Sequence, residues 1–139
     1  MRADSFLDSN ILVYAVSGDP DEAARTARAL ELIGTADFGI SAQVLQEFYV
    51  TVVRKIAKPL APTEALEWVE QFAKFPCHPT GADTVHLGAE ISETYRISYW
   101  DGAILAAAQS LGARTLFTED LNHGQDYGGV RVMDPFLGQ

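Results

Sequence analysis

The most constraining feature of the sequence is an alternation, from one end of the chain to the other, between short apolar stretches and longer segments with helical periodicity. Residues 3–7, 38–40, 115–117 and 130–133 have the length and character of buried strands. Between them, apolar residues recur three and four positions apart, as on one face of an α-helix. This alternation predicts an α/β protein, with three α/β/α layers around a central, mostly parallel sheet.

Capping residues, proline and glycine predict where the helices begin and end. The expected helices begin after Asp8-Ser9-Asn10, at Pro20, after Ser41, at Thr63, at Asp83 and at Trp100. Gly34 and Gly112 are expected to end the second and the last of them. Each helix carries an apolar stripe toward the predicted core, and these stripes include Leu30, Leu66 and Val85.

The length and composition suit one globular domain. The chain has 139 residues and a hydrophobic share of 47%, and we expect a single domain over 1–139. No segment approaches the roughly 20 apolar residues that span a bilayer. The first residues lack the basic start, the long apolar region and the cleavage site of a signal peptide. We therefore expect a cytoplasmic protein with no membrane partner.

The net charge of −9 argues against a nucleic-acid partner, because binding of a phosphate backbone depends on Lys and Arg. Carboxylates that hold divalent ions weaken this argument, since the loaded site attracts phosphate. The basic residues also cluster, and Arg54, Lys55 and Lys58 lie together at the end of one predicted helix. The acidic composition therefore leaves a nucleic-acid substrate open.

Two acidic residues follow predicted strands. Asp8 and Asp120 lie at the strand ends where open parallel sheets place their ligand-binding crevices. Both positions have an alternative explanation: Asp8, with Ser9 and Asn10, suits the cap of the next helix, and Asp120 suits a turn that continues to Asn122. The residues alone leave both explanations open.

Asp101 lies in the apolar stripe of its helix, since Ile104, Leu105 and Ala108 follow it at spacings of three, four and seven. An ionised carboxylate on this face costs several kcal/mol unless a positive charge compensates it, and residues 100–111 include no Lys or Arg. The alternative is a capping box in which Ser98 is the N-cap. The missing positive charge favours a bound cation.

Glu47 lies at the border of the apolar stripe of its helix, one residue before Phe48 and three after Val44. At such a position, a carboxylate that faces a crevice and one that faces solvent are equally compatible with the periodicity. The residues around Glu47 do not decide between them.

Carboxylates within about 4 Å of one another repel by roughly 4 kcal/mol per pair at an effective dielectric constant near 20, so a shared site requires a cation. A set of oxygen ligands without Cys or His favours Mg²⁺ or Mn²⁺ over zinc. Such an ion activates water for attack on phosphorus. If the four acids converge, the reaction class is metal-assisted hydrolysis of a phosphodiester.

Four segments carry a resemblance to a known family. They are Phe6–Leu12, Gln43–Tyr49 with Arg54 and Lys55 after it, Ser98–Ile104, and Thr118–Leu121 followed by His123–Gln125. In this order, and over nearly the whole chain, they resemble the PIN domain. More narrowly, the chain resembles a VapC-type toxin of a bacterial or archaeal toxin–antitoxin pair.

The resemblance implies a metal-dependent endoribonuclease that uses Mg²⁺ or Mn²⁺. Asp8 and Asp101 match direct metal ligands, and Glu47 matches a residue that orients a metal-bound water or binds the ion itself. Asp120 matches the acid that completes the site, with Glu119 as the alternative ligand.

The resemblance also implies hydrogen-bonding residues around these carboxylates and several partners. Ser9, Asn10 and Thr118 match residues that orient the carboxylates. The implied partners are an RNA substrate, a cognate antitoxin protein and a second copy of the chain in a homodimer.

Two other functions are compatible with parts of the sequence. A PIN-fold module that binds RNA or a regulatory partner without catalysis would suit the acidic composition. A phosphoaspartate-type receiver or phosphatase would suit an acid after the first strand, but Asp8-Ser9-Asn10 lacks the second aspartate that such phosphatases use, and no Lys accompanies the last strand-end loop.

Overall fold

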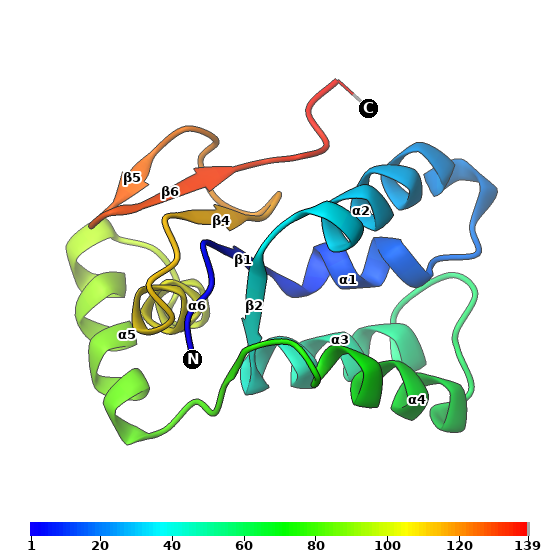
Figure 1. The fold of residues 1–139 in the computed structure, drawn as a ribbon, viewed down its shortest axis with the longest axis horizontal. Coiled ribbons are helices and arrows are strands. Elements are labelled where there is room, and N and C mark those ends of the chain that lie inside the picture. The colour runs from blue at the N-terminus through cyan, green and yellow to red at the C-terminus, as the bar shows by residue number, and fades with distance from the viewer. Residues whose placement is uncertain (139) are drawn as a thin grey trace.

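A computed structural model describes residues 1–138, which form a six-stranded sheet with helices on both sides (Figure 1). The strands are β1 (Ser5–Leu7), β2 (Phe38–Ser41), β3 (Cys77–His78), β4 (Thr115–Phe117), β5 (Asp126–Tyr127) and β6 (Val130–Met133). Their order is β3-β2-β1-β4-β6-β5, and every neighbouring pair is parallel except β5 with β6. The predicted mostly parallel sheet is confirmed.

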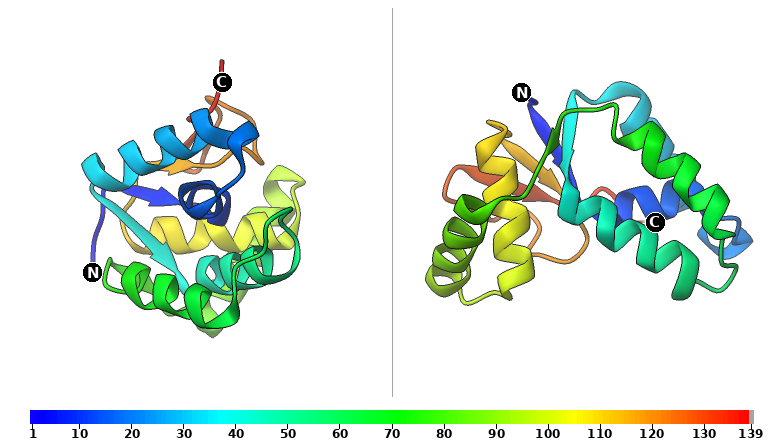
Figure 2. Two further views of the ribbon diagram at one scale, coloured as in Figure 1. Left: turned by 90° about the vertical axis from the view of Figure 1, so that its right-hand side faces the viewer. Right: turned by 90° about the horizontal axis from the view of Figure 1, so that it is seen from below.

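The helices form the outer layers. They are α1 (Ser9–Val16), α2 (Ala23–Thr35), α3 (Ala42–Arg54), α4 (Pro62–Phe72), α5 (Ala82–Tyr95) and α6 (Tyr99–Ser110), with a short 3₁₀ helix, η1 (Pro20–Glu22), before α2. In Figure 1, α5 and α6 lie on one side of β1 and β2, and α1 and α2 lie on the other. Figure 2 shows α3 and α4 side by side. No helix in the described part of the chain is long and apolar enough to cross a bilayer.

Most of the predicted helix ends agree with the structure to within a few residues, because local capping produces them. The Ser41 hydroxyl accepts a hydrogen bond from the Val44 N–H at 3.2 Å, which satisfies one free donor at the start of α3. Gly112 follows α6 with φ of 75°, a left-handed conformation that favours glycine. The prediction for Pro20 is wrong in detail, since this residue begins η1 and α2 starts at Ala23.

The predicted apolar stripes are shifted on three helices. Leu30, Leu66 and Val85 are 50%, 51% and 50% exposed, so they are not core residues. The three smaller residues that immediately precede them are buried: Ala29, Ala65 and Thr84. A small side chain lets a helix approach its neighbour closely, and the larger apolar residue next to it then lies at the edge of the contact.

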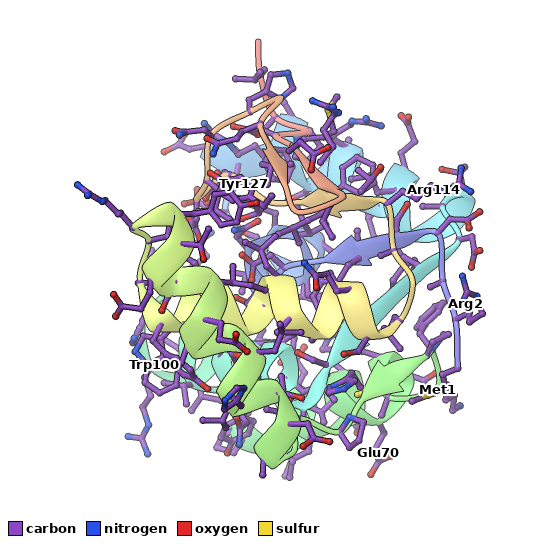
Figure 3. All side chains as sticks on the ribbon, turned by 90° about the vertical axis from the view of Figure 1, so that its left-hand side faces the viewer. Met1, Arg2, Glu70, Trp100, Arg114 and Tyr127 are labelled. Atoms are coloured by element: carbon purple, nitrogen blue, oxygen red, sulfur yellow. The ribbon has the colours of Figure 1, made fainter. Side chains whose placement is uncertain are left out.

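Close packing of α5 on α6 depends on glycine. A Cβ atom on Gly88 would lie 2.8 Å from the Cα of Ala103, and a Cβ on Gly102 would collide with the Gly88 carbonyl. The two helices therefore touch backbone to backbone, with α5 in front of α6 in Figure 3. All residues from Gly102 to Ala108 are buried as a result, which fixes the position of Asp101 at the start of α6.

β3 and β5 were not predicted from the sequence, because each has only two residues and shows no period. β3 pairs with the end of β2, through Ile40 with Cys77. β5 forms a hairpin with β6 across Gly128 and Gly129, whose φ values of 67° and 100° produce the tight turn.

Candidate metal centre

The candidate site lies beside β1, where the order of the strands reverses in the sheet. β1 continues to β2 and β3 on one side, and β4 and β6 pair on its other side. Ligands of open α/β sheets bind at this kind of switch point, outside the carboxyl ends of the strands. Asp8 follows β1, and Thr118 follows β4. The last residues of these two strands, Leu7 and Phe117, are paired in the sheet.

Asp8 is held by two hydrogen bonds and is only 5% exposed. Its Oδ1 accepts from the Ser9 N–H at 2.7 Å, and its Oδ2 accepts from the Thr118 hydroxyl at 2.8 Å. Asp8 is thus the N-cap of α1, as the capping explanation predicted. An N-cap residue can still bind a cation, because each carboxylate oxygen of Asp8 keeps a second lone pair for a further partner.

Thr118 connects Asp8 to a second carboxylate. Its hydroxyl oxygen accepts from the Asp120 N–H at 3.1 Å and from Asn10 Nδ2 at 3.1 Å. Asn10 Nδ2 also donates to Asp120 Oδ2 at 3.2 Å. The Glu119 carboxylate instead accepts a hydrogen bond from the Tyr14 hydroxyl at 2.9 Å. Asp120, and not Glu119, is therefore linked to Asp8.

Glu47 and Asp101 come from the two helices α3 and α6, and both are half-buried. Ser98 is the N-cap of α6 and accepts from the Asp101 N–H at 3.1 Å, so the predicted capping contact exists. Gln43, one turn before Glu47, donates from Nε2 to the Trp100 carbonyl at 3.1 Å and joins α3 to α6. Gln43 was not predicted as a site residue, although its spacing of four from Glu47 is visible in the sequence.

Burial raises the pKa values of three of these acids, and hydrogen bonds and neighbouring charges modify the shift. Burial raises the pKa of Asp8 from 3.8 to about 7, against the hydrogen bonds from Thr118 and Ser9, and the charges of Glu47 and Asp120 raise it further. Burial also raises the pKa of Glu47; the Gln43 side chain opposes this, and Asp101 and Asp120 add to it.

The pKa of Asp101 is also raised. Burial raises its pKa, the hydrogen bond with Ser98 lowers it, and the negative charge of Asp120 raises it. Each of the four carboxylates thus lies within electrostatic range of at least one other. Their ionised forms repel one another, and a cation would lower the free energy of the ionised set.

The donor set suits a hard divalent ion. It consists of carboxylate oxygens, and Asn10 turns its Nδ2 toward Asp120 and Thr118. The Asn10 Oδ1 atom is buried and has no hydrogen-bond partner among the described residues. No three His, Cys, Asp or Glu side chains within residues 1–138 are grouped closely enough to hold one ion. An ion bound in this arrangement would need water molecules to complete its coordination, as Mg²⁺ commonly does.

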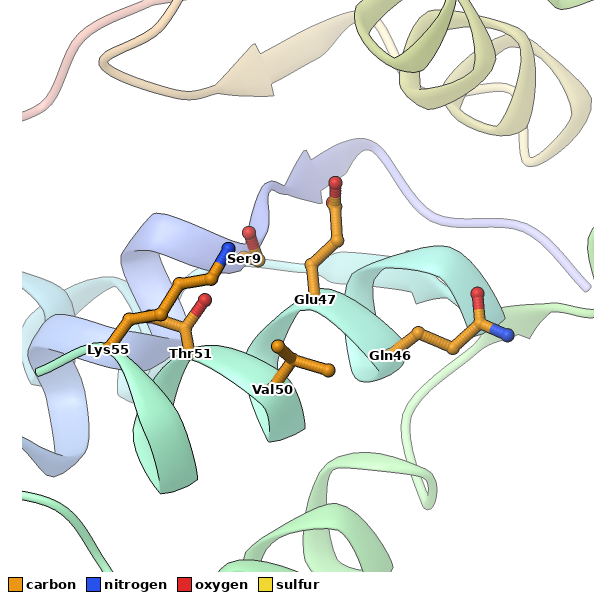
Figure 4. A pocket seen from close by; sticks show the side chains of 6 residues that line it. All are labelled: Ser9, Gln46, Glu47, Val50, Thr51 and Lys55. Atoms are coloured by element: carbon orange, nitrogen blue, oxygen red, sulfur yellow. The ribbon is translucent and has the colours of Figure 1, made fainter.

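A hollow of about 330 Å³ opens beside Glu47. Its lining residues are Ser9, Gln46, Glu47, Val50, Thr51 and Lys55 (Figure 4). Trp100, immediately before Asp101, is 65% exposed (Figure 3). The site is therefore reachable from solvent along α3 and at the start of α6.

The fold and this crevice define an α/β/α protein with an acidic site at the switch point of its sheet. The family model of the PIN domain matches residues 5–125. The chain belongs to the PIN domain family, and the predicted family resemblance is confirmed. A comparison with curated protein sequences gives no significant match.

Several solved structures share the fold. A toxin–antitoxin complex from Klebsiella pneumoniae has a TM-score of 0.70 at 19% identity, with 95% of this chain and 98% of that chain covered. VapC20 of Mycobacterium tuberculosis, a toxin that cleaves the sarcin–ricin loop, has a TM-score of 0.66 at 19% identity, with 84% and 91% covered. DNA-bound VapBC from Salmonella typhimurium has a TM-score of 0.64 at 22% identity, with 97% and 99% covered.

Proposed function

We propose that this protein is a metal-dependent endoribonuclease and the toxin of a type II toxin–antitoxin system. The observation that carries the proposal is the buried Asp8, hydrogen-bonded through Thr118 toward Asp120 and electrostatically coupled to Glu47. A buried carboxylate among other carboxylates is unfavourable without a cation, and the structurally similar toxin VapC20 cleaves the sarcin–ricin loop.

The residues have distinct functions in this proposal. Asp8 and Asp101 bind Mg²⁺ or Mn²⁺ directly, Asp120 completes the site, and Glu47 either binds the ion or orients a water molecule near it. When bound, the ion activates water and stabilises negative charge on the phosphate. Ionised Asp8, Asp101 and Asp120 are the forms that bind it.

The hydrogen-bonding residues determine the orientation of these carboxylates. Ser9 and Thr118 each hold one oxygen of Asp8, and Asn10 holds one oxygen of Asp120. This leaves the second lone pairs of the Asp8 oxygens available. Fixed carboxylates bind an ion with less loss of side-chain entropy than mobile ones.

The partners follow from the same proposal. The substrate is RNA, and the inhibitor is a cognate antitoxin, since the relatives from Klebsiella pneumoniae and Salmonella typhimurium are toxin–antitoxin complexes. We further propose a cytoplasmic homodimer. The alternative is a PIN-fold module that binds RNA or a regulatory protein without catalysis, and the acidic net charge of −9 favours it.

Cleavage of RNA by the purified chain tests the proposal. We expect products from a short RNA with Mg²⁺ or Mn²⁺, none with EDTA, and none from Asp8→Ala or Asp101→Ala with either ion. Glu67→Gln is a matched control, because Glu67 is an exposed acid on α4. Equal cleavage by the wild type and both site variants would refute the proposal, and RNA binding without products would favour the non-catalytic module.

A further inference from the structure

Beside the candidate metal centre, the hollow along α3 contains a positive charge. We propose that Lys55, with the hydroxyls of Thr51 and Ser9, binds a backbone phosphate of the RNA strand next to the phosphate that is cleaved. This inference rests on the proposed function, because it assigns the neighbouring phosphate of the same substrate. All three residues line the hollow, together with Glu47.

The geometry of α3 places these residues in a row. Glu47, Thr51 and Lys55 are spaced by four, so they lie on one face of the helix, about 6 Å apart along its axis. In Figure 4, the Lys55 ammonium extends toward Ser9, and the Thr51 hydroxyl lies on the same side. The row therefore leads away from the acidic centre, and a strand lying along it would pass from Glu47 to Lys55.

The charge of Lys55 is available to an incoming anion. The ion pairs of residues 1–138 are Arg28 with Glu31, His86 with Glu90, and Arg131 with Asp126, so Lys55 takes part in none of them. It is nevertheless close enough to Glu47 to lower the pKa of that carboxyl. Lys55 is thus a cation at the border of an acidic site, without a fixed partner of its own.

The chemistry of the substrate requires such a cation. An RNA strand that is cut within its length has a phosphate on each side of the cleaved phosphate. An ion at the acidic centre neutralises only the phosphate charge closest to it. With 19 acidic and 10 basic residues, the protein repels the other phosphates unless basic side chains lie next to them. A lysine ammonium is a point charge with three donors, which suits a phosphate oxygen, and the two hydroxyls can donate as well.

The main alternative is that Lys55 acts only within the protein, by screening Glu47 or by stabilising the end of α3, where it is the C-cap. The two explanations predict different effects of replacing Lys55. A phosphate contact affects binding of RNA and its dependence on salt, whereas an effect through Glu47 changes the chemical step.

Kinetics of metal-dependent RNA cleavage by Lys55→Gln, Lys55→Arg and Arg54→Gln separate these explanations. The probe is a short single-stranded RNA with Mn²⁺. For Lys55→Gln we expect KM to rise about fivefold to tenfold while kcat stays within about twofold, as for loss of a binding contact. The slope of log(kcat/KM) against log salt should fall in magnitude by about 0.7, the value for one phosphate contact on a single strand.

The two other variants are the controls. Lys55→Arg keeps the charge and should restore KM to within about threefold of the wild type. Arg54→Gln removes the same charge from an exposed neighbour that does not line the hollow, and should change KM by less than about twofold.

Three results would overturn the inference. In the first, Lys55→Gln has the KM and salt slope of Arg54→Gln, so the site binds no phosphate. In the second, kcat falls and KM is unchanged, so Lys55 acts through Glu47. In the third, the wild type cleaves no RNA with either ion, and the proposed function fails with it; the first two leave the ribonuclease proposal intact.

Discussion

Asp8 is a buried acid near other acids, and we predict that Asp8→Asn makes the metal-free protein more stable at neutral and alkaline pH. The Asp8 side chain is 5% exposed, and burial raises its pKa from 3.8 to about 7. Its neighbours Glu47 and Asp120 oppose its ionisation too. The folded protein therefore stores an unfavourable interaction whenever Asp8 is ionised and no cation is bound.

The magnitude follows from the pKa values. Because each pKa unit is worth about 1.4 kcal/mol, the interval from 3.8 to about 7 corresponds to about 4 kcal/mol in favour of the neutral form. An Asn side chain can accept from the Ser9 N–H, but its amide then meets the Thr118 hydroxyl, and one weakened hydrogen bond costs about 1 kcal/mol. We expect Asp8→Asn to be more stable than the wild type by about 2–3 kcal/mol above pH 7.

The pH dependence has a definite sign. Below about pH 4, Asp8 is protonated in both states and contributes no pH dependence. Between about pH 4 and pH 7, the unfolded chain loses the proton and the folded protein keeps it, so the free energy of unfolding falls as pH rises. Above about pH 7 the loss is complete. Asn does not titrate, so the advantage of Asp8→Asn should grow across this window.

Urea denaturation in EDTA, at several pH values from about 4 to 9, measures the difference between the two proteins. Added Mn²⁺ should raise the unfolding free energy of the wild type and leave Asp8→Asn nearly unchanged, because binding to the folded state stabilises it. Glu67→Gln controls for removal of an exposed acid. A variant that is less stable than the wild type at pH 8, or a difference that does not vary with pH, would refute the reasoning.

Other variants test the hydrogen bonds of Thr118, the packing of α5 on α6, and the choice between Asp120 and Glu119. Thr118→Val removes the hydroxyl that accepts from the Asp120 N–H and donates to Asp8. It should lower the unfolding free energy by about 2 kcal/mol in urea titrations, and an unchanged free energy would contradict the hydrogen-bond network. Gly88→Ala places a Cβ 2.8 Å from the Ala103 Cα and should cost about 1–3 kcal/mol, measured by thermal unfolding; unchanged stability would mean that α5 and α6 separate easily. Asp120→Asn should lower RNA cleavage about tenfold to a hundredfold, whereas Glu119→Gln should not; the reverse ranking would make Glu119 the ligand.

The sequence by itself determined the class of the fold and the main strand ends. Short apolar stretches and helical periodicity are local properties, so the alternation of elements and the positions of β1 and β4 were predictable. Caps are local as well, which is why α3 begins after Ser41 as expected and why Ser98 is the N-cap that the capping-box alternative for Asp101 predicted. Asp8 was predicted at a strand end for the same reason. The segments that resemble the PIN domain are spread from Phe6 to Gln125, and the family model matches residues 5–125.

Tertiary structure decided which faces are covered and which side chains meet. Ala29, and not Leu30, is buried because the neighbouring layer selects the small residue, and periodicity alone cannot locate that contact. The hydrogen bond from Thr118 to Asp8 joins residues 110 positions apart, and the choice of Asp120 over Glu119 depends on it and on Tyr14. Lys55 lies near Ser9 only because α1 and α3 pack together. The acids could be identified from the sequence, but the interactions that orient them exist only once distant strands are side by side.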